Sequence, residues 1–155
     1  MRYMKRRHIN VSAATAAPAH IVYSLLIDGT TWPSWSPIDS FELEREGTPP
    51  PEGVGAIRVF RRGRTTGRDE IIELVPERKL AYASRSGVPV RDYVGEITLD
   101  ATPEGGTKIV WHSSFFAKAP GSGWIVQRAL TSFLDKCVHG LADASDQALA
   151  RRTAR

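Results

Sequence analysis

The fold is decided by residues 122 to 150, whose sequence is SGWIVQRALTSFLDKCVHGLADASDQALA. Apolar residues recur in it at spacings of three and four, the period that places side chains on one face of an α-helix. These residues are Val126, Leu130, Phe133, Leu134, Cys137, Leu141, Ala144 and Ala148. Ser122 can cap such a helix, and Arg151 and Arg152 place positive charge at the negative end of its dipole. A helix of about 25 to 30 residues, roughly 40 Å long at 1.5 Å per residue, needs a large apolar surface to pack against.

The segments before this helix have the pattern of β-strands. Residues 8 to 13 alternate polar and apolar side chains, which is typical of a half-buried strand, and a short helix is expected from Ala19 to Ile27 after Pro18. Six further strands are expected, separated by turn sequences rich in glycine and proline. They cover residues 41–44, 55–62, 68–75, 80–84, 91–99 and 107–117. Both alternations of residues 68 to 75 carry charges, so the facing of that strand stays open.

The order of these elements predicts an α+β fold. Consecutive strands with short connections form an antiparallel sheet that curls under its own twist. Together with the first strand the sheet has about seven strands, and two short helices follow that first strand, the second within residues 30 to 37. The long C-terminal helix is expected across the concave face. No linker divides the sequence, so we expect one domain over residues 1 to 155, with basic tails at 1 to 7 and 151 to 155.

Composition excludes several classes of function. The net charge is +4, but the two tails carry seven positive charges, which leaves residues 8 to 150 at −3 and argues against nucleic-acid binding. No apolar run reaches the roughly 18 residues of a membrane span, and no signal peptide is evident, so we expect a cytoplasmic protein. The histidines and the single cysteine, Cys137, lack metal-ligand spacing, and no phosphate loop or nucleophile motif is present. We therefore expect neither a metal nor a cofactor.

Four motifs give the sequence a resemblance to a known superfamily. They are APAHIVY at residues 17 to 23, DGTTWPSWSP at 28 to 37, ELVPERKLAY at 73 to 82 and GGTKIVW at 105 to 111. With them the chain resembles the START-like, helix-grip proteins of the SRPBCC superfamily, in particular the bacterial polyketide cyclase/dehydrase and lipid-transport type. The resemblance implies a sheet that grips the long helix, and an apolar cavity between them that holds a hydrophobic or amphipathic small molecule. Because this fold hosts binding proteins, carriers and enzymes, the motifs do not assign a reaction.

The inner face of the later strands is expected to mix aromatic, polar and aliphatic side chains. A dry core rarely contains so many polar atoms, which a ligand or ordered water would satisfy. Two tryptophans in the loop after the first helix either plug the end of the core or line the entrance of the cavity, and two leucines of the long helix face the sheet. The candidate ligand-binding residues are Trp32, Trp35, Tyr82, Ser84, Arg91, Tyr93, Trp111, Ser113, Leu130 and Leu134.

Three functions fit these residues. The first is binding of a lipid or polyketide-like molecule in the cavity. The second is a polyketide cyclase/dehydratase, in which Tyr82 or Tyr93 would donate a proton and Arg91 would hold an enolate. The third is docking of an acidic partner, such as an acyl carrier protein, by arginines around a hairpin loop expected at residues 63 to 67. These arginines are Arg58, Arg61, Arg62, Arg64 and Arg68, with Arg58 and Arg62 expected to point outward.

Overall fold

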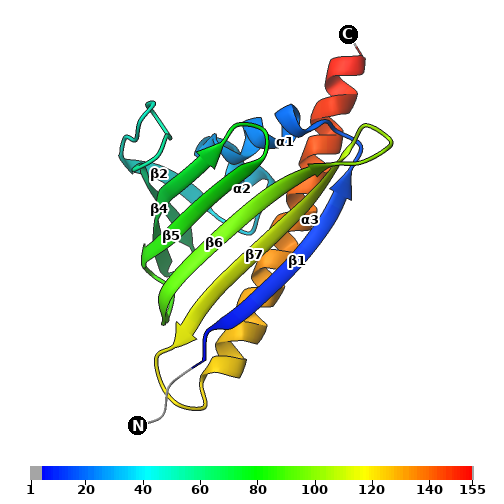
Figure 1. Ribbon diagram of the computed structural model, residues 1–155. Helices are drawn as coiled ribbons and strands as arrows, with labels where there is room; N and C mark the ends of the chain where they lie inside the picture. The colour runs from blue at the N-terminus through cyan, green and yellow to red at the C-terminus, as the bar shows by residue number, and fades with distance from the viewer. Residues whose placement is uncertain (1–4, 155) are drawn as a thin grey trace.

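The structure, a computed structural model, describes residues 5 to 154. Its seven strands form one antiparallel sheet in the order β1-β7-β6-β5-β4-β3-β2 (Figure 1). The strands are β1 (Arg7–Thr15), β2 (Ser40–Arg45), β3 (Ile57–Arg62), β4 (Thr65–Val75), β5 (Lys79–Ser86), β6 (Val90–Ala101) and β7 (Thr107–Ala117). The helices are α1 (Ala19–Leu26), the 3₁₀ turn η1 (Gly29–Thr31), α2 (Trp32–Trp35) and α3 (Gly123–Thr153). The predicted α+β fold, with two short helices after β1 and a long C-terminal helix, is confirmed.

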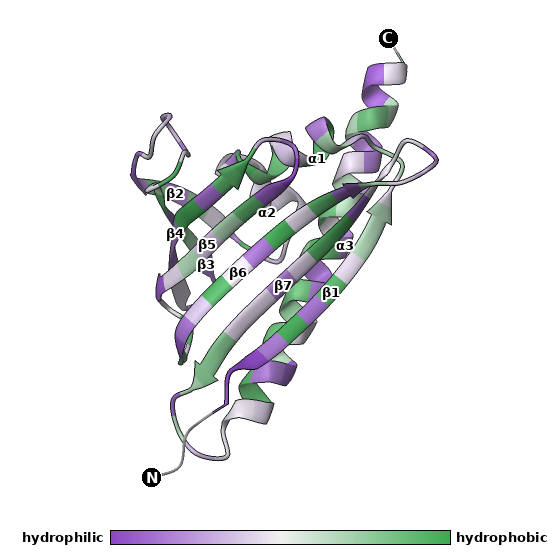
Figure 2. Cartoon of the chain, viewed as in Figure 1, coloured by the Kyte–Doolittle hydropathy of each residue, from purple (hydrophilic) through white to green (hydrophobic). Residues whose placement is uncertain are grey.

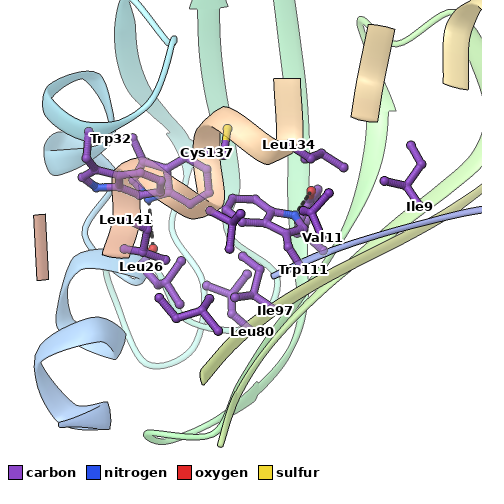
Figure 3. Packing of buried hydrophobic residues seen from close by; sticks show 14 of the residues in the cluster. Ile9, Val11, Leu26, Trp32, Leu80, Ile97, Trp111, Leu134, Cys137 and Leu141 are labelled. Carbon is purple, nitrogen blue, oxygen red and sulfur yellow. Dashed lines mark hydrogen bonds between the residues drawn. The ribbon is translucent and has the colours of Figure 1, made fainter. Parts of the chain in front are cut away.

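Alternation of side chains along the strands builds the core. Hydrophobic and hydrophilic residues alternate along β6 and β7 (Figure 2), and Ile97, Ile109 and Phe115 are fully buried on the face toward α3. Gly95 lies across from Tyr82, and its missing side chain leaves room for the tyrosine ring, because a Cβ there would lie 2.3 Å from it. Figure 3 shows Trp32, Trp111, Leu134, Cys137 and Leu141 gathered between the helix and the strands. The core therefore lies between the concave face of the sheet and α3.

The two halves of α3 are buried to different extents. In its middle, Leu134, Cys137 and Leu141 are at most 1% exposed. There the helix backbone touches α2 directly, since a Cβ on Gly140 would lie 1.7 Å from the carbonyl oxygen of Trp35. The first turns are looser. Val126, Leu130 and Phe133 are only half-buried, and Trp124 and Ile125 are exposed.

Parts of the predicted basic tails belong to the folded structure. Arg6 Nη1 donates hydrogen bonds to the Asp92 carbonyl oxygen at 3.1 Å and to Ser114 Oγ at 2.8 Å, and Arg7 begins β1. At the other end α3 continues through Arg151 and Arg152 to Thr153. Arg6 and Arg7 are thus tied to the sheet, and Arg151 and Arg152 form the exposed last turn of α3, where their positive charge was expected. Residues 1 to 4 and Arg155 lie outside the described residues. Between residues 5 and 154, no helix combines the length and apolarity needed to cross a membrane.

Candidate functional site

A pocket of about 480 Å³ lies between the first half of α3 and the concave face of the sheet. This volume is within the roughly 300 to 1,000 Å³ usual for small-molecule sites. The helix contributes Ile125, Val126, Ala129, Leu130 and Phe133. The sheet and its connections contribute Trp32, Ile38, Arg58, Phe60, Arg62, Thr65, Gly67, Asp69, Tyr82, Gly87, Val88, Pro89 and Trp111. Most of the lining is apolar, and its only ionisable groups besides Tyr82 are Arg58, Arg62 and Asp69.

Four of the ten candidate ligand-binding residues line this pocket: Trp32, Tyr82, Trp111 and Leu130. Four others are buried behind that wall: Trp35, Tyr93, Ser113 and Leu134. Trp35, for example, packs against Trp32 with ring centroids 4.6 Å apart and donates from Nε1 to Thr31 Oγ1 at 3.0 Å. Ser84 is half-buried and donates to the Ser86 carbonyl oxygen at 3.3 Å without lining the pocket.

Arg91 is exposed, and its predicted inward orientation is wrong. The reason is a β-bulge in β6. Arg91 pairs with Phe116 and Val94 with Ser114, so β6 holds one more residue than β7 between these pairs, and Asp92 has a φ of +49°. An extra residue reverses the alternation of side chains, which puts Val90 and Tyr93 inside and Arg91 outside. A strict period of two, applied through the bulge, assigned Arg91 to the wrong face.

The buried polar groups of the wall bond to one another. Trp111 Nε1 donates to Tyr82 Oη at 3.0 Å, the hydroxyl groups of Tyr82 and Tyr93 are 3.4 Å apart, and Tyr93 Oη is 2.8 Å from Ser113 Oγ. Within residues 5 to 154, no buried side-chain nitrogen or oxygen lacks a hydrogen-bond partner. These groups therefore need neither a ligand nor water, and the expectation that a ligand or ordered water satisfies them is wrong.

Arg58 is buried, and its predicted outward orientation is also wrong. It is 2% exposed, its Nε donates to Glu52 Oε1 at 2.9 Å, and its Nη2 donates to the Leu26 carbonyl oxygen at 2.8 Å. The guanidinium carbon lies 4.8 Å from the centre of the Trp32 ring and 5.2 Å from that of Phe60. An acidic partner from the loop before β3, together with these aromatic faces, makes the inward position of the charge tolerable. Ile57 and Val59, on the opposite alternation, are buried as well.

Asp69 is the site residue that the sequence analysis missed. It lies directly across from Arg58 in the β3–β4 register and lines the pocket. The missed signal was the length of the hairpin. Only Gly63 and Arg64 separate β3 from β4, whereas a loop over residues 63 to 67 was expected. A two-residue turn fixes the register and would have placed Asp69 opposite Arg58.

The Asp69 carboxyl group is held in surroundings that disfavour its charge. Burial raises the pKa of Asp69 to about 7, and the positive charge of Arg58 only partly opposes this effect. Burial also raises the pKa of Tyr82 well above its usual value and that of Tyr93 to about 12. Of the ionisable groups on this wall, Asp69 is therefore the one able to gain and lose a proton near neutral pH.

We expect Asp69→Asn to raise the midpoint of thermal unfolding by a few degrees at about pH 8 and by less at about pH 5. The aspartate pKa is about 3.9 in the unfolded chain and about 7 in the folded one. The stability gained from the protonated carboxyl is complete below the unfolded value and is lost as the pH rises through the folded value. Asparagine cannot ionise, so the Asp69→Asn protein should not lose this stability as the pH rises. Scanning calorimetry across this range, with Asp100→Asn as an exposed control, measures the difference, and an equal effect at both pH values would contradict it.

The arginine cluster predicted around the hairpin does not form one open basic surface. Arg58 is buried, Arg61 pairs with Glu42 at 3.1 Å, and Arg68 makes a bidentate ion pair with Glu44. Arg62 lies over the Phe133 ring, 5.0 Å from its centre, at the rim of the pocket. Of the five arginines, Arg62 and Arg64 are the two without a carboxylate partner among residues 5 to 154. Acidic residues of β2 and of the loop before β3 thus form ion pairs with three of the five arginines that docking would use.

A long helix held against a curved seven-stranded sheet, with a pocket beneath its first half, defines a START-like helix-grip protein. Residues 6 to 146 match the model of the family described as polyketide cyclase/dehydrase and lipid transport, and the chain belongs to this family. No curated protein matches the chain in sequence.

Solved structures of the same fold come from proteins of different kinds. A START superfamily protein from Mycobacterium smegmatis is 12% identical with a TM-score of 0.77, covering 91% of this chain and 98% of its own. Norcoclaurine synthase of Thalictrum flavum is 16% identical with a TM-score of 0.75 (96% and 99% covered). The ZhuI aromatase/cyclase from Streptomyces sp. R1128 is 18% identical with a TM-score of 0.72 (94% and 96% covered). At these identities the likeness establishes the fold alone.

Proposed function

We propose that this protein binds a hydrophobic or amphipathic small molecule, of lipid or polyketide-like character, in the pocket beneath α3. The observation that carries the proposal is a largely apolar pocket of about 480 Å³, in whose wall the buried Trp111 and Tyr82 are hydrogen-bonded to each other. Such a wall favours an occupant that buries apolar surface, because each Å² removed from water contributes roughly 25 cal/mol. Membership of a family that includes lipid transport supports the same function.

We expect Leu130→Trp to weaken binding of a neutral apolar probe, N-phenyl-1-naphthylamine, by at least about tenfold. Leu130 lines the pocket, and the larger ring would occupy volume that the probe needs. Ser132→Trp, two residues along on the exposed side of α3, is the matched control and should leave affinity unchanged. Fluorescence titration measures both affinities, and circular dichroism shows that the variants remain folded. Unchanged affinity in a folded Leu130→Trp protein would place the probe elsewhere and count against this pocket.

A second candidate function is cyclisation or dehydration of a polyketide in the same pocket. Asp69 favours it, because a general base is most effective when its pKa lies near the working pH, and that of Asp69 is about 7. The tyrosines first considered as proton donors are less suited, since their hydroxyl groups are hydrogen-bonded and their pKa values are raised. A cyclisation rate that rises with pH through about 7 and is lost in Asp69→Asn would favour the enzyme over the carrier.

A further inference from the structure

The charged groups that line the pocket differ in whether they are already paired. Glu52 compensates the charge of Arg58 at 2.9 Å, and Arg62 lies at the rim over the Phe133 ring. Asp69 makes no side-chain hydrogen bond or ion pair with any residue from 5 to 154, although it lines the pocket and is half-buried. An ionised carboxylate only accepts hydrogen bonds, so a molecule that pairs with Asp69 must supply a donor. The Asp69 carboxylate is therefore free to accept a hydrogen bond from a donor that enters the pocket.

The other charges near Asp69 determine which donor suits it. Arg58 across the strand pair is matched by Glu52, which leaves ionised Asp69, and Arg62 at the rim over Phe133, as the unmatched charges of the lining. Tyr82 on β5 is hydrogen-bonded to Trp111, and Ser84 across from Asp69 is uncharged. The pocket residues of α3, from Ile125 to Phe133, carry no ionisable group. A ligand carboxylate placed beside Asp69 would meet like charge, whereas a protonated amine or a hydroxyl group placed there would meet an acceptor.

We propose that Asp69 makes this pocket selective for apolar molecules with a hydrogen-bond-donating head group, a protonated amine or a hydroxyl, over those with a carboxylate. This inference rests on the proposed function, since it names the ligand class of the same pocket. The chain of the ligand would lie against Trp32, Trp111, Leu130 and Phe133, and its head group would donate to the Asp69 carboxylate. Hydrogen bonds to a charged group are about twice as strong as neutral ones, so the amine gains most.

Three ligands with the same twelve-carbon chain test the inference: dodecylamine, dodecanol and dodecanoate. Each is titrated against bound N-phenyl-1-naphthylamine at about pH 8, where Asp69 is ionised. The amine and the alcohol should displace the probe at concentrations about tenfold or more below that of dodecanoate. Lowering the pH to about 5.5 protonates Asp69. The concentrations at which the amine, the alcohol and dodecanoate displace the probe should then lie closer together.

The isosteric change Asp69→Asn assigns the effect to one group. It should weaken dodecylamine about tenfold and tighten dodecanoate, whereas the exposed control Asp100→Asn should change neither affinity. Equal displacement by all three ligands, or an unchanged ranking in Asp69→Asn, would show that Asp69 is partnered by water only and overturn the inference while the binding function stands. Wild-type protein that binds neither the probe nor any of the three ligands would overturn the proposed function, and the inference with it.

Discussion

Replacing Arg58 with methionine is expected to lower the free energy of unfolding by about 3 to 5 kcal/mol. The side chain is 2% exposed, and it compensates Glu52, which is itself buried. Methionine fills similar volume but leaves the carboxylate of Glu52 without its cation, and that carboxylate also accepts from the backbone N–H of Gly29 at 2.8 Å. A loss of this size is a large part of the roughly 5 to 15 kcal/mol that stabilises a domain.

Equilibrium unfolding in urea, followed by circular dichroism, measures this loss. The double variant Arg58→Met with Glu52→Gln should recover much of it, because position 52 then no longer buries a carboxylate without its cation. Arg61→Met removes an exposed ion pair to Glu42 and should cost less than about 1 kcal/mol. If Arg58→Met lowered the free energy of unfolding as little as Arg61→Met does, the stabilising role of the buried Arg58–Glu52 ion pair would be contradicted.

Replacing Trp111 with alanine is expected to cost about 3 to 5 kcal/mol. The indole is 1% exposed, meets Trp32 edge-on with centroids 5.7 Å apart, and donates to Tyr82 Oη. Truncation removes buried apolar contacts and also leaves the Tyr82–Tyr93 network without its donor. Trp111 forms part of the pocket wall as well, so affinity for the apolar probe should fall in any fraction that still folds.

Two controls separate the contributions of Trp111. Trp111→Phe keeps most of the ring but loses the indole donor, and should cost nearer 1 kcal/mol from the hydrogen bond. Trp124→Ala truncates the same residue type at a position that is 59% exposed, and should fall within about 0.5 kcal/mol of wild type. Chemical unfolding of all three variants under the same conditions gives the comparison, and near-equal costs at positions 111 and 124 would contradict the buried position of Trp111.

Most of the fold could be predicted from the sequence because hydrophobic periodicity extends over long segments. The stripe from Val126 to Ala148 specifies one long helix, and the strands alternate clearly enough to predict an antiparallel sheet. Each error in orientation occurs where a single local feature changes the alternation or the cost of burial. The bulge at Asp92 moved Arg91 outside, and the ion pair with Glu52 allowed Arg58 inside.

The site was less predictable because its character depends on contacts between distant residues. Tyr82 and Trp111 could be assigned to the pocket wall from alternation alone, but the bond between them could not. Asp69 has no distinctive local sequence. It becomes notable only through its pairing across the sheet with Arg58 and through the apolar residues of α3, about 60 positions later, that enclose the same pocket.

The contact at Gly140 also bears on how a ligand reaches the pocket. Because helix and α2 backbones touch there, α3 can neither slide nor rotate at that point without disturbing Trp35. Its first turns, from Gly123 to Phe133, are held to β1 by side-chain hydrogen bonds between Arg7 and Gln127 at 2.8 Å and from Gln127 to the His8 carbonyl oxygen at 3.0 Å, and they leave Trp124 and Ile125 in solvent. Local opening requires least free energy where few side chains are buried, so we expect these turns, once the bonds of Gln127 to β1 break, to open before Leu134 to Leu141. We therefore expect exchange of the proposed ligand to require opening of this helix end, while the sheet stays closed.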